Sequence, residues 1–170
     1  MNLYEVKDRN PRLVDQLVAV WEDSVRSTHL FLSSEEVKKI KEFVPCALMK
    51  VEHLIIAEKA PSRPVAFMGM ENNRLEMLFL SPLERGKGLG RKLLEYGIRN
   101  YGINEVTVNE QNHQAVRFYR HMGFEEYKRT DFDEEGNPLP SFIHDVEHSI
   151  LITIFRKTHY KTNMKTNGIL

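Results

Sequence analysis

The stretch LFLSPLERGKGLGRK, residues 78–92, carries the strongest structural signal in this chain of 170 residues. Its first three residues are apolar and predict a buried strand, and the amphipathic spacing from Leu89 onward predicts a helix. Between them stand three glycines at alternate positions, beginning with Gly86. Glycines allow a ligand to approach the backbone closely, and a helix N-terminus offers unpaired N–H groups. The stretch therefore predicts a phosphate or diphosphate site. The basic side chains around it are Arg85, Lys87, Arg91 and Lys92.

Two better-known phosphate loops do not fit this spacing. A P-loop needs serine or threonine directly after Gly86-Lys87, and Gly88 stands there. A dinucleotide fingerprint begun at either of the first two glycines would need glycine at position 91 or 93, which hold arginine and leucine. The pattern that remains is Arg-x-x-Gly-x-Gly over residues 85–90. A turn that binds no ligand is the alternative.

Apolar periodicity predicts the elements on either side of this stretch. In chain order we expect a strand over 2–7, helices over 11–26 and from 34 to Pro45, strands over 53–58, 65–70 and 75–80, a helix over 89–101, a strand over 105–109, a short helix that follows Asn112 and ends at Gly123, a strand over 124–129, a turn over 135–137 and a strand over 150–155. This mixed α/β order lacks the regular alternation of a doubly wound fold.

Composition limits the class of protein. Apolar residues make up 41% of the chain and charged residues 28%, which is typical of a soluble globular domain. No apolar run is long enough to cross a membrane, and a charged N-terminus argues against secretion. Cys46 is the one cysteine, which excludes an internal disulfide and fits a reducing, cytoplasmic location.

Charge gives no sign of a nucleic-acid or membrane partner. Lysine plus arginine equals aspartate plus glutamate, at 24 each. Residues 156–170 nevertheless hold four basic and no acidic side chains, and we interpret residues 157–170 as a solvated basic tail after a folded domain over 1–156. The sequence leaves monomer and homodimer both open.

A second block then makes the chain resemble the GNAT superfamily of acetyl-CoA-dependent N-acetyltransferases. Residues 85–90 match the family's motif A, Arg/Gln-x-x-Gly-x-Gly/Ala, which follows the fourth strand. Residues 108–124, VNEQNHQAVRFYRHMGF, resemble its motif B, an asparagine before a short helix that bears Phe-Tyr and ends in Gly-Phe. Residues 21–33 are similar to a bacterial branch that includes a peptidyl-lysine acetyltransferase. The resemblance implies a mostly antiparallel sheet, splayed between strands 4 and 5 and flanked by helices.

The resemblance also implies the site. In the family, backbone amides of the fourth strand hold the pantetheine arm and polarise the thioester, motif A amides bind the diphosphate, the motif B asparagine helps to bind acetyl-CoA, and its tyrosine protonates the departing thiolate. The matching residues here are Leu78, Phe79 and Leu80 on the strand, Arg85, Gly86, Lys87, Gly88, Leu89, Gly90 and Arg91 in motif A, and Asn112 and Tyr119 in motif B. No metal is implied.

The expected chemistry is direct attack of a neutral amine on the thioester through a tetrahedral intermediate, with the Leu80 N–H as an oxyanion donor. A lysine amine has a pKa of ~10.4, so a base would assist. Glu76, on the expected fourth strand, is the first candidate, and His29 is the second, as base or as part of the acceptor site. Many family members carry a glutamate on the fifth strand, where this chain has Thr107 or Asn109.

One rival motif lies near the C-terminus. Residues 144–148, HDVEH, match His-x-x-Glu-His, a zinc-peptidase pattern that needs a helix and a third ligand. Prolines precede it at positions 138 and 140, and no acidic residue follows Glu147, so we interpret it as a polar loop before the last strand.

We therefore expect an acetyl-CoA-dependent N-acetyltransferase that acts on a primary amine, with peptidyl-lysine as one possible acceptor. A non-catalytic acyl-CoA-binding or regulatory module is the alternative. Turnover with an amine would separate the two.

Overall fold

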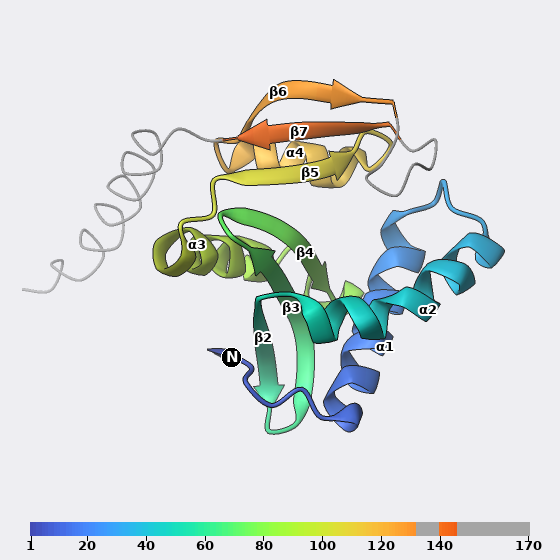
Figure 1. Ribbon diagram of the computed structural model, residues 1–170, viewed down its shortest axis with the longest axis vertical. Helices are drawn as coiled ribbons and strands as arrows, with labels where there is room; N and C mark the ends of the chain where they lie inside the picture. The colour runs from blue at the N-terminus through green and yellow to red at the C-terminus, as the bar shows by residue number, and fades with distance from the viewer. Residues whose placement is uncertain (132–139, 146–170) are drawn as a thin grey trace, which may run out of the picture.

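The computed structural model describes residues 1–131 and 140–145, and these form one sheet with helices against it (Figure 1). The elements in chain order are β1 (Asn2–Glu5), α1 (Pro11–Thr28), α2 (Ser34–Lys50), β2 (His53–Ala60), β3 (Arg63–Glu71), β4 (Arg74–Leu80), the 3-10 turn η1 (Pro82–Glu84), α3 (Leu89–Tyr101), β5 (Glu105–Asn109), α4 (His113–His121), β6 (Glu125–Thr130) and β7 (Ser141–Asp145). The mixed α/β class is confirmed.

The sheet has the strand order β1-β2-β3-β4-β5-β7-β6 and opens in its middle. All neighbouring strands pair antiparallel except β4 and β5, which run parallel and pair only at Arg74–Glu105 and Leu75–Val106. Beyond Leu75 the two strands separate. The register of β4 on β3 shifts there too, because Gly69 faces Met77 while Met70 faces Leu75. Glu76 is thus the extra residue of a β-bulge at the point where the sheet splays.

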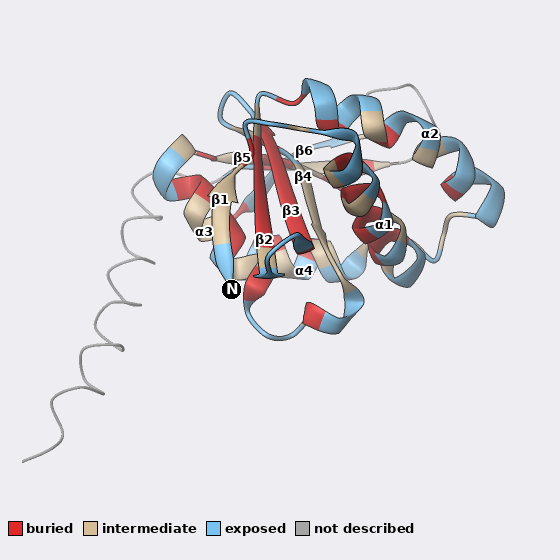
Figure 2. Ribbon diagram, turned by 90° about the horizontal axis from the view of Figure 1, so that it is seen from below, coloured by how far each residue is buried: buried red, intermediate tan, exposed pale blue. Residues whose placement is uncertain are grey.

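Apolar side chains pack against both faces of the sheet. Buried residues run along β2 and β3 and lie on part of α1 (Figure 2). One core joins the sheet to α3 and α4 and includes Leu93, Ile103 and Phe124. The other joins it to α1 and α2 and includes Leu17 and Leu48. Residues 64–70 of β3 are buried throughout, which explains why this strand appears in the sequence as a continuous apolar run instead of an alternating one.

Polar side chains cap the starts of α1 and α2. The Asn10 side chain accepts a hydrogen bond from Leu13 N at 3.1 Å, and Ser33 forms a capping box with Glu36. The prediction that the second helix stops at Pro45 is wrong, since α2 continues through it to Lys50. Val44 and Leu48 lie in the core on either side of it. Their burial, worth about 1.5–3 kcal/mol each, offsets the ~3 kcal/mol cost of an interior proline.

The C-terminal half differs more from the sequence prediction. The strand expected over 124–129 is confirmed as β6, and its partner in the described chain is β7. The prediction of a polar loop at the start of residues 144–148 is wrong, because His144 and Asp145 are strand residues of β7. A helix that begins at His144 is thereby excluded. The turn at 135–137, the strand at 150–155, the rest of the HDVEH motif and the basic tail lie outside the described residues.

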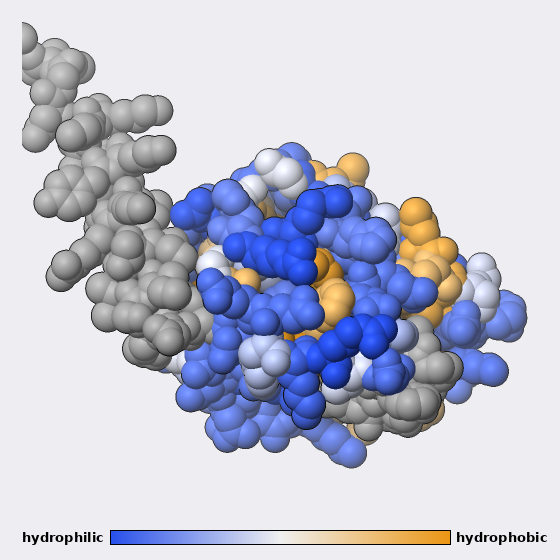
Figure 3. Space-filling model, turned by 90° about the horizontal axis from the view of Figure 1, so that it is seen from above, coloured by the Kyte–Doolittle hydropathy of each residue, from blue (hydrophilic) through white to orange (hydrophobic). Residues whose placement is uncertain are grey.

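The sheet ends at β6, whose first five residues, EEYKR, are exposed. Viewed from above relative to Figure 1, the face of the molecule is mainly hydrophilic, with hydrophobic residues in a small central patch and at the top and right edges of the view (Figure 3). Charged side chains on an edge strand disfavour pairing with further strands.

Candidate active site

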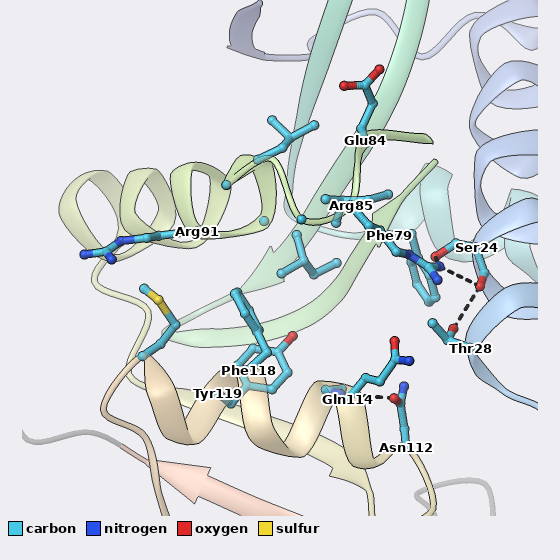
Figure 4. Close-up of a pocket in the computed structure, with 18 of the residues that line it drawn as sticks. Ser24, Thr28, Phe79, Glu84, Arg85, Arg91, Asn112, Gln114, Phe118 and Tyr119 are labelled. Atoms are coloured by element: carbon cyan, nitrogen blue, oxygen red, sulfur yellow. Dashed lines mark hydrogen bonds between the residues drawn. The ribbon is translucent and has the colours of Figure 1, made fainter. Parts of the chain in front are cut away.

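A cavity of about 440 Å³ lies where β4, the glycine turn, α4 and the C-terminal end of α1 meet (Figure 4). It collects most of the predicted site: Leu78, Phe79 and Leu80 of β4, Arg85, Gly86, Gly88, Leu89, Gly90 and Arg91 of the turn, Asn112 and Tyr119 of motif B, and His29. Ser24, Thr28, Gln114 and Phe118 also line it and were not singled out from the sequence. Lys87 and Glu76 are not among the lining residues.

The glycine turn presents a bare backbone to this cavity. Gly86 and Gly88 have φ of 71° and 78°, a left-handed conformation that favours glycine. A Cβ at either position would have no atom within 4 Å, so the space in front of them is open to a ligand. The first intrahelical donor of α3 is Lys92 N, which bonds Gly88 O at 3.0 Å. The N–H groups of residues 89–91 therefore have no acceptor within the helix and can bind an anion.

The splay of the sheet gives β4 unpaired amides beside the same cavity. Ser81 N donates to Val65 O on β3 at 2.8 Å. Successive residues of a strand direct their N–H groups to opposite sides, so the amides of Leu80 and Leu78 point away from β3, toward β5. The register between β4 and β5 ends at Leu75 and Val106, so β5 supplies these two amides with no partner. They can polarise a carbonyl placed in the opening.

Arg85 does not project into solvent as a simple phosphate ligand. Its Nη2 donates to Ser24 O at 2.9 Å and to Ser24 Oγ at 3.1 Å, so the guanidinium ties the glycine turn to the end of α1 (Figure 4). Burial lowers the pKa of this guanidinium from its usual value. The group is a cation at the cavity wall, held by neutral oxygen acceptors.

Two more of the basic side chains around the turn, Lys87 and Arg91, pair with carboxylates. Lys87 Nζ lies 3.5 Å from Glu84 Oε2, and Lys59 Nζ lies 3.0 Å from Glu84 Oε1. The hydrogen bond from Lys59 and the nearby positive charges hold the pKa of Glu84 below its usual range. Arg91 Nε lies 2.8 Å from Glu95 Oε1. These ion pairs fix the ends of the turn, and the open space in front of Gly86 and Gly88 leaves its backbone accessible.

α4 brings Asn112 and Tyr119 to the opposite wall. Asn112 Oδ1 accepts a hydrogen bond from Ala115 N at 3.1 Å and caps the helix, which leaves its amide NH2 as a donor. Tyr119 is 7% exposed, and its hydroxyl points from α4 toward β4 in Figure 4. Burial raises the pKa of this phenol above its usual value, so Tyr119 stays protonated across the accessible pH range.

His29 closes the cavity at the end of α1. Its ring packs against Phe31, with 5.4 Å between the ring centroids, and Nδ1 lies 2.9 Å from Thr28 Oγ1. Burial, together with the positive charge of Arg85, lowers the pKa of His29 to about 4. The imidazole is therefore neutral at physiological pH.

The structure separates the two candidate bases. Glu76 Oε1 lies 3.4 Å from Arg74 Nε, in a different hollow at the closed end of the β4–β5 opening. The two fifth-strand positions supply no carboxylate: Thr107 Oγ1 accepts from Arg74 Nη2 at 2.7 Å, and Asn109 Oδ1 accepts from Gln111 N at 2.8 Å. Of Glu76 and His29, His29 alone lines the cavity that holds Tyr119.

Comparison with known proteins agrees with this geometry. Residues 29–139 match the family of acetyltransferase (GNAT) domains. The chain belongs to the GNAT acetyltransferase family. It is 37% identical over 126 residues to the peptidyl-lysine N-acetyltransferase YjaB of Escherichia coli strain K12, a match that covers 74% of this chain and 85% of that protein. The YjaB protein of Salmonella typhimurium is 36% identical over 126 residues, with 74% and 86% covered.

Solved structures show the same fold. The solution structure of apo-form YjaB from Escherichia coli superposes with a TM-score of 0.75 at 34% identity, covering 85% of this chain and 97% of that one. The PaiA N-acetyltransferase of Thermoplasma acidophilum, solved in complex with coenzyme A, has a TM-score of 0.62 at 22% identity and covers 87% and 100%. This GNAT domain is an acetyltransferase whose acetyl donor is acetyl-CoA.

In the part of the chain that the structure describes, residues 1–131 and 140–145, no set of three histidine, cysteine, aspartate or glutamate side chains could hold a metal ion. None of the helices in this part of the chain combines the length and the apolar character of a membrane span.

Proposed function

We propose that this GNAT domain transfers the acetyl group of acetyl-CoA to the side-chain amine of a protein lysine in the cytoplasm. The convergence of three groups on one cavity carries the proposal: the open amides of the glycine turn, the amides of β4 that the splay leaves unpaired, and the buried hydroxyl of Tyr119. The YjaB relatives, named as peptidyl-lysine N-acetyltransferases, support lysine as the acceptor.

Each part of the chain then has a defined role. The turn amides and the first N–H groups of α3 bind the diphosphate of acetyl-CoA. The N–H of Leu80 stabilises the negative charge that develops on the thioester oxygen, where a preorganised donor is most effective. Tyr119 donates a hydrogen bond, and finally a proton, to the sulfur that leaves. Because burial raises the pKa of Tyr119, this donation follows the development of charge on sulfur.

The first test is thermal unfolding with acetyl-CoA, with ATP and NAD as phosphate-bearing controls. A ligand at 100 times its dissociation constant stabilises the fold by roughly 2.7 kcal/mol, which raises the Tm of a domain of this size by about 5–10 °C. We expect this rise with acetyl-CoA alone. An equal rise in Tm with all three ligands would indicate that the turn binds anions without selectivity for acetyl-CoA.

The second test concerns the acceptor. We expect release of free CoA with a peptide that has one lysine and a blocked N-terminus, and none with the same peptide carrying arginine in its place. Turnover with free amines but not with the lysine peptide would overturn the assignment of the acceptor and leave the acetyltransferase activity intact.

A further inference from the structure

The hydrogen bonds at the end of α1 determine which nitrogen of His29 carries its proton. Thr28 Oγ1 lies 2.8 Å from Ser24 O and 2.9 Å from His29 Nδ1. A carbonyl oxygen only accepts, so the single hydroxyl proton of Thr28 is donated to Ser24 O. Thr28 Oγ1 can then only accept from the imidazole. His29 therefore carries its proton on Nδ1, and its Nε2 has an unprotonated lone pair.

Arg85 holds this arrangement against the cofactor turn. Its Nη2 donates to the same Ser24 carbonyl at 2.9 Å, so the last turn of α1 cannot shift without breaking a contact to the glycine turn. Ser24 is 5% exposed, which protects these hydrogen bonds from competition by water. The imidazole orientation is thus set by a chain of contacts from Arg85 through Ser24 and Thr28 to His29.

We infer that Nε2 of His29 accepts the proton that the acceptor amine loses during acetyl transfer, and that Thr28 is a positioning residue that keeps Nε2 available. The inference rests on the proposed function, since it assigns the proton path of that reaction. It places the proton acceptor at the end of α1 and not on the strands, where Glu76 lies in another hollow.

The transfer conserves protons and electron pairs. The lone pair of the neutral amine forms the C–N bond while the carbonyl pair moves to oxygen, next to the Leu80 N–H. The carbonyl re-forms, the C–S bond breaks with its electron pair on sulfur, and Tyr119 supplies the proton that yields the thiol. The surplus proton on nitrogen passes to His29 Nε2. Exchange through solvent then returns a proton to Tyr119 and removes one from His29.

His29 is a weak base, which suits the uptake of a proton from the nitrogen after the amine has attacked. With a pKa of about 4, it cannot deprotonate a lysine ammonium with a pKa of ~10.4, so the amine must arrive neutral. After attack, however, the nitrogen acquires amide character and its extra proton becomes strongly acidic. A weak base that remains unprotonated in cellular conditions is then sufficient.

The tautomer can be measured without activity. In ¹⁵N-labelled protein, long-range ¹H–¹⁵N correlation spectra distinguish Nδ1–H from Nε2–H imidazole. We expect the Nδ1–H form for His29 in the wild type and a shift toward Nε2–H in Thr28→Val, which removes the hydroxyl but keeps the shape. If His29 of the wild type carries its proton on Nε2, the inference is overturned. This measurement on the wild type does not depend on whether Thr28→Val folds.

Kinetics with the lysine peptide test the role. We expect His29→Asn to lower kcat by about 10²-fold, the usual scale of general base catalysis, and Thr28→Val by about tenfold, with Thr28→Ser restoring it. Ser34→Ala, which removes an exposed hydroxyl at the start of α2 away from the cavity lining, is the matched control and should retain wild-type kcat. The Tm rise with acetyl-CoA should persist in all four variants.

The outcomes separate the two proposals. If the wild type acetylates the peptide and His29→Asn is equally active, the inference about His29 is overturned and the proposed function stands. A wild type that binds acetyl-CoA but acetylates no lysine overturns the proposed acceptor. We also expect kcat/KM of the wild type to rise with pH toward the pKa of the amine, and an ionisation near pH 6.5 that disappears in His29→Asn would contradict a neutral His29.

Discussion

At the scale of single residues, Tyr119 combines a packing role with the proposed role of proton donor, and one substitution separates the two. Its ring contacts Phe118 and Phe124 edge-on, with centroids 5.0 and 5.9 Å apart, while its hydroxyl faces the cavity. Tyr119→Phe keeps the ring and removes only the proton donor. We expect kcat to fall by about 10²-fold, with the acetyl-CoA-dependent Tm rise unchanged.

Tyr127→Phe is the matched control for this prediction. Tyr127 is 53% exposed, and its hydroxyl donates to Glu105 at 2.8 Å, away from the cavity lining. The kcat of Tyr127→Phe should equal that of the wild type. If Tyr119→Phe also keeps wild-type kcat while folding normally, another group protonates the thiolate.

At the scale of elements, α3 offers a comparison between its two ends. Gly88 and Gly102 flank the helix with φ of 78° and 69°. Alanine at either position pays the left-handed penalty of roughly 1–2 kcal/mol, so both variants should lose similar stability. Only the Cβ of Gly88→Ala enters the open space in front of the glycine turn, where we propose that the diphosphate binds. We expect its KM for acetyl-CoA to rise at least tenfold, and that of Gly102→Ala to stay unchanged.

Urea unfolding and acetyl-CoA titration of the two variants check this prediction together. Equal losses of affinity would show that Gly88 acts through helix stability and not through contact with the ligand. A Gly88→Ala variant that binds acetyl-CoA as the wild type does would contradict the placement of the diphosphate.

At the scale of the whole molecule, two histidines make folding sensitive to mild acid. Burial lowers the pKa of His29 to about 4 and also lowers that of His144, which is 0% exposed and has no hydrogen-bond partner at either ring nitrogen in the described chain. The unfolded chain therefore binds more protons than the fold below pH ~6.5. Stability is full above that pH and falls as pH drops through it.

We expect the Tm of the unliganded protein to fall between pH 7.5 and 5.5, with about 1 kcal/mol lost through His29 alone. Carboxylates with lowered pKa, such as Glu84, lose their contribution only below their usual 4.5, outside this window. Differential scanning calorimetry of His144→Leu should show a smaller fall in Tm than that of the wild type. His113→Gln, which changes an exposed histidine, should show the same fall in Tm as the wild type. A Tm that is constant over this window would contradict the burial of both groups.

Interactions between residues close in sequence explain which features of the structure could be predicted from the sequence. Helix caps at Asn10, Ser33 and Asn112 and the glycines of the turn act over three or four residues, so their effect is visible in the chain itself. The apolar stripes predicted most strands and helices for the same reason. Together with the family resemblance, they were sufficient for the fold class and for most residues of the cavity.

Other features depend on contacts between distant segments. Pro45 is tolerated because the core buries its neighbours, and His144 lies in a strand because β5 and β6 pair on either side of it. The bulge at Glu76 arises only from the register of β4 on β3. No spacing rule within one segment specifies such pairings.

The strand, the glycine turn and the helix N-terminus belong to one segment, so their capacity to receive an anion on backbone N–H groups could be read from the chain alone. Which side chains meet across the cavity depends on how distant segments pack. Arg85 bonds Ser24, 61 positions away, and thereby aligns Thr28 and His29. Backbone conformation is governed by near neighbours, whereas the partner of a half-buried charge is selected by packing of the whole fold.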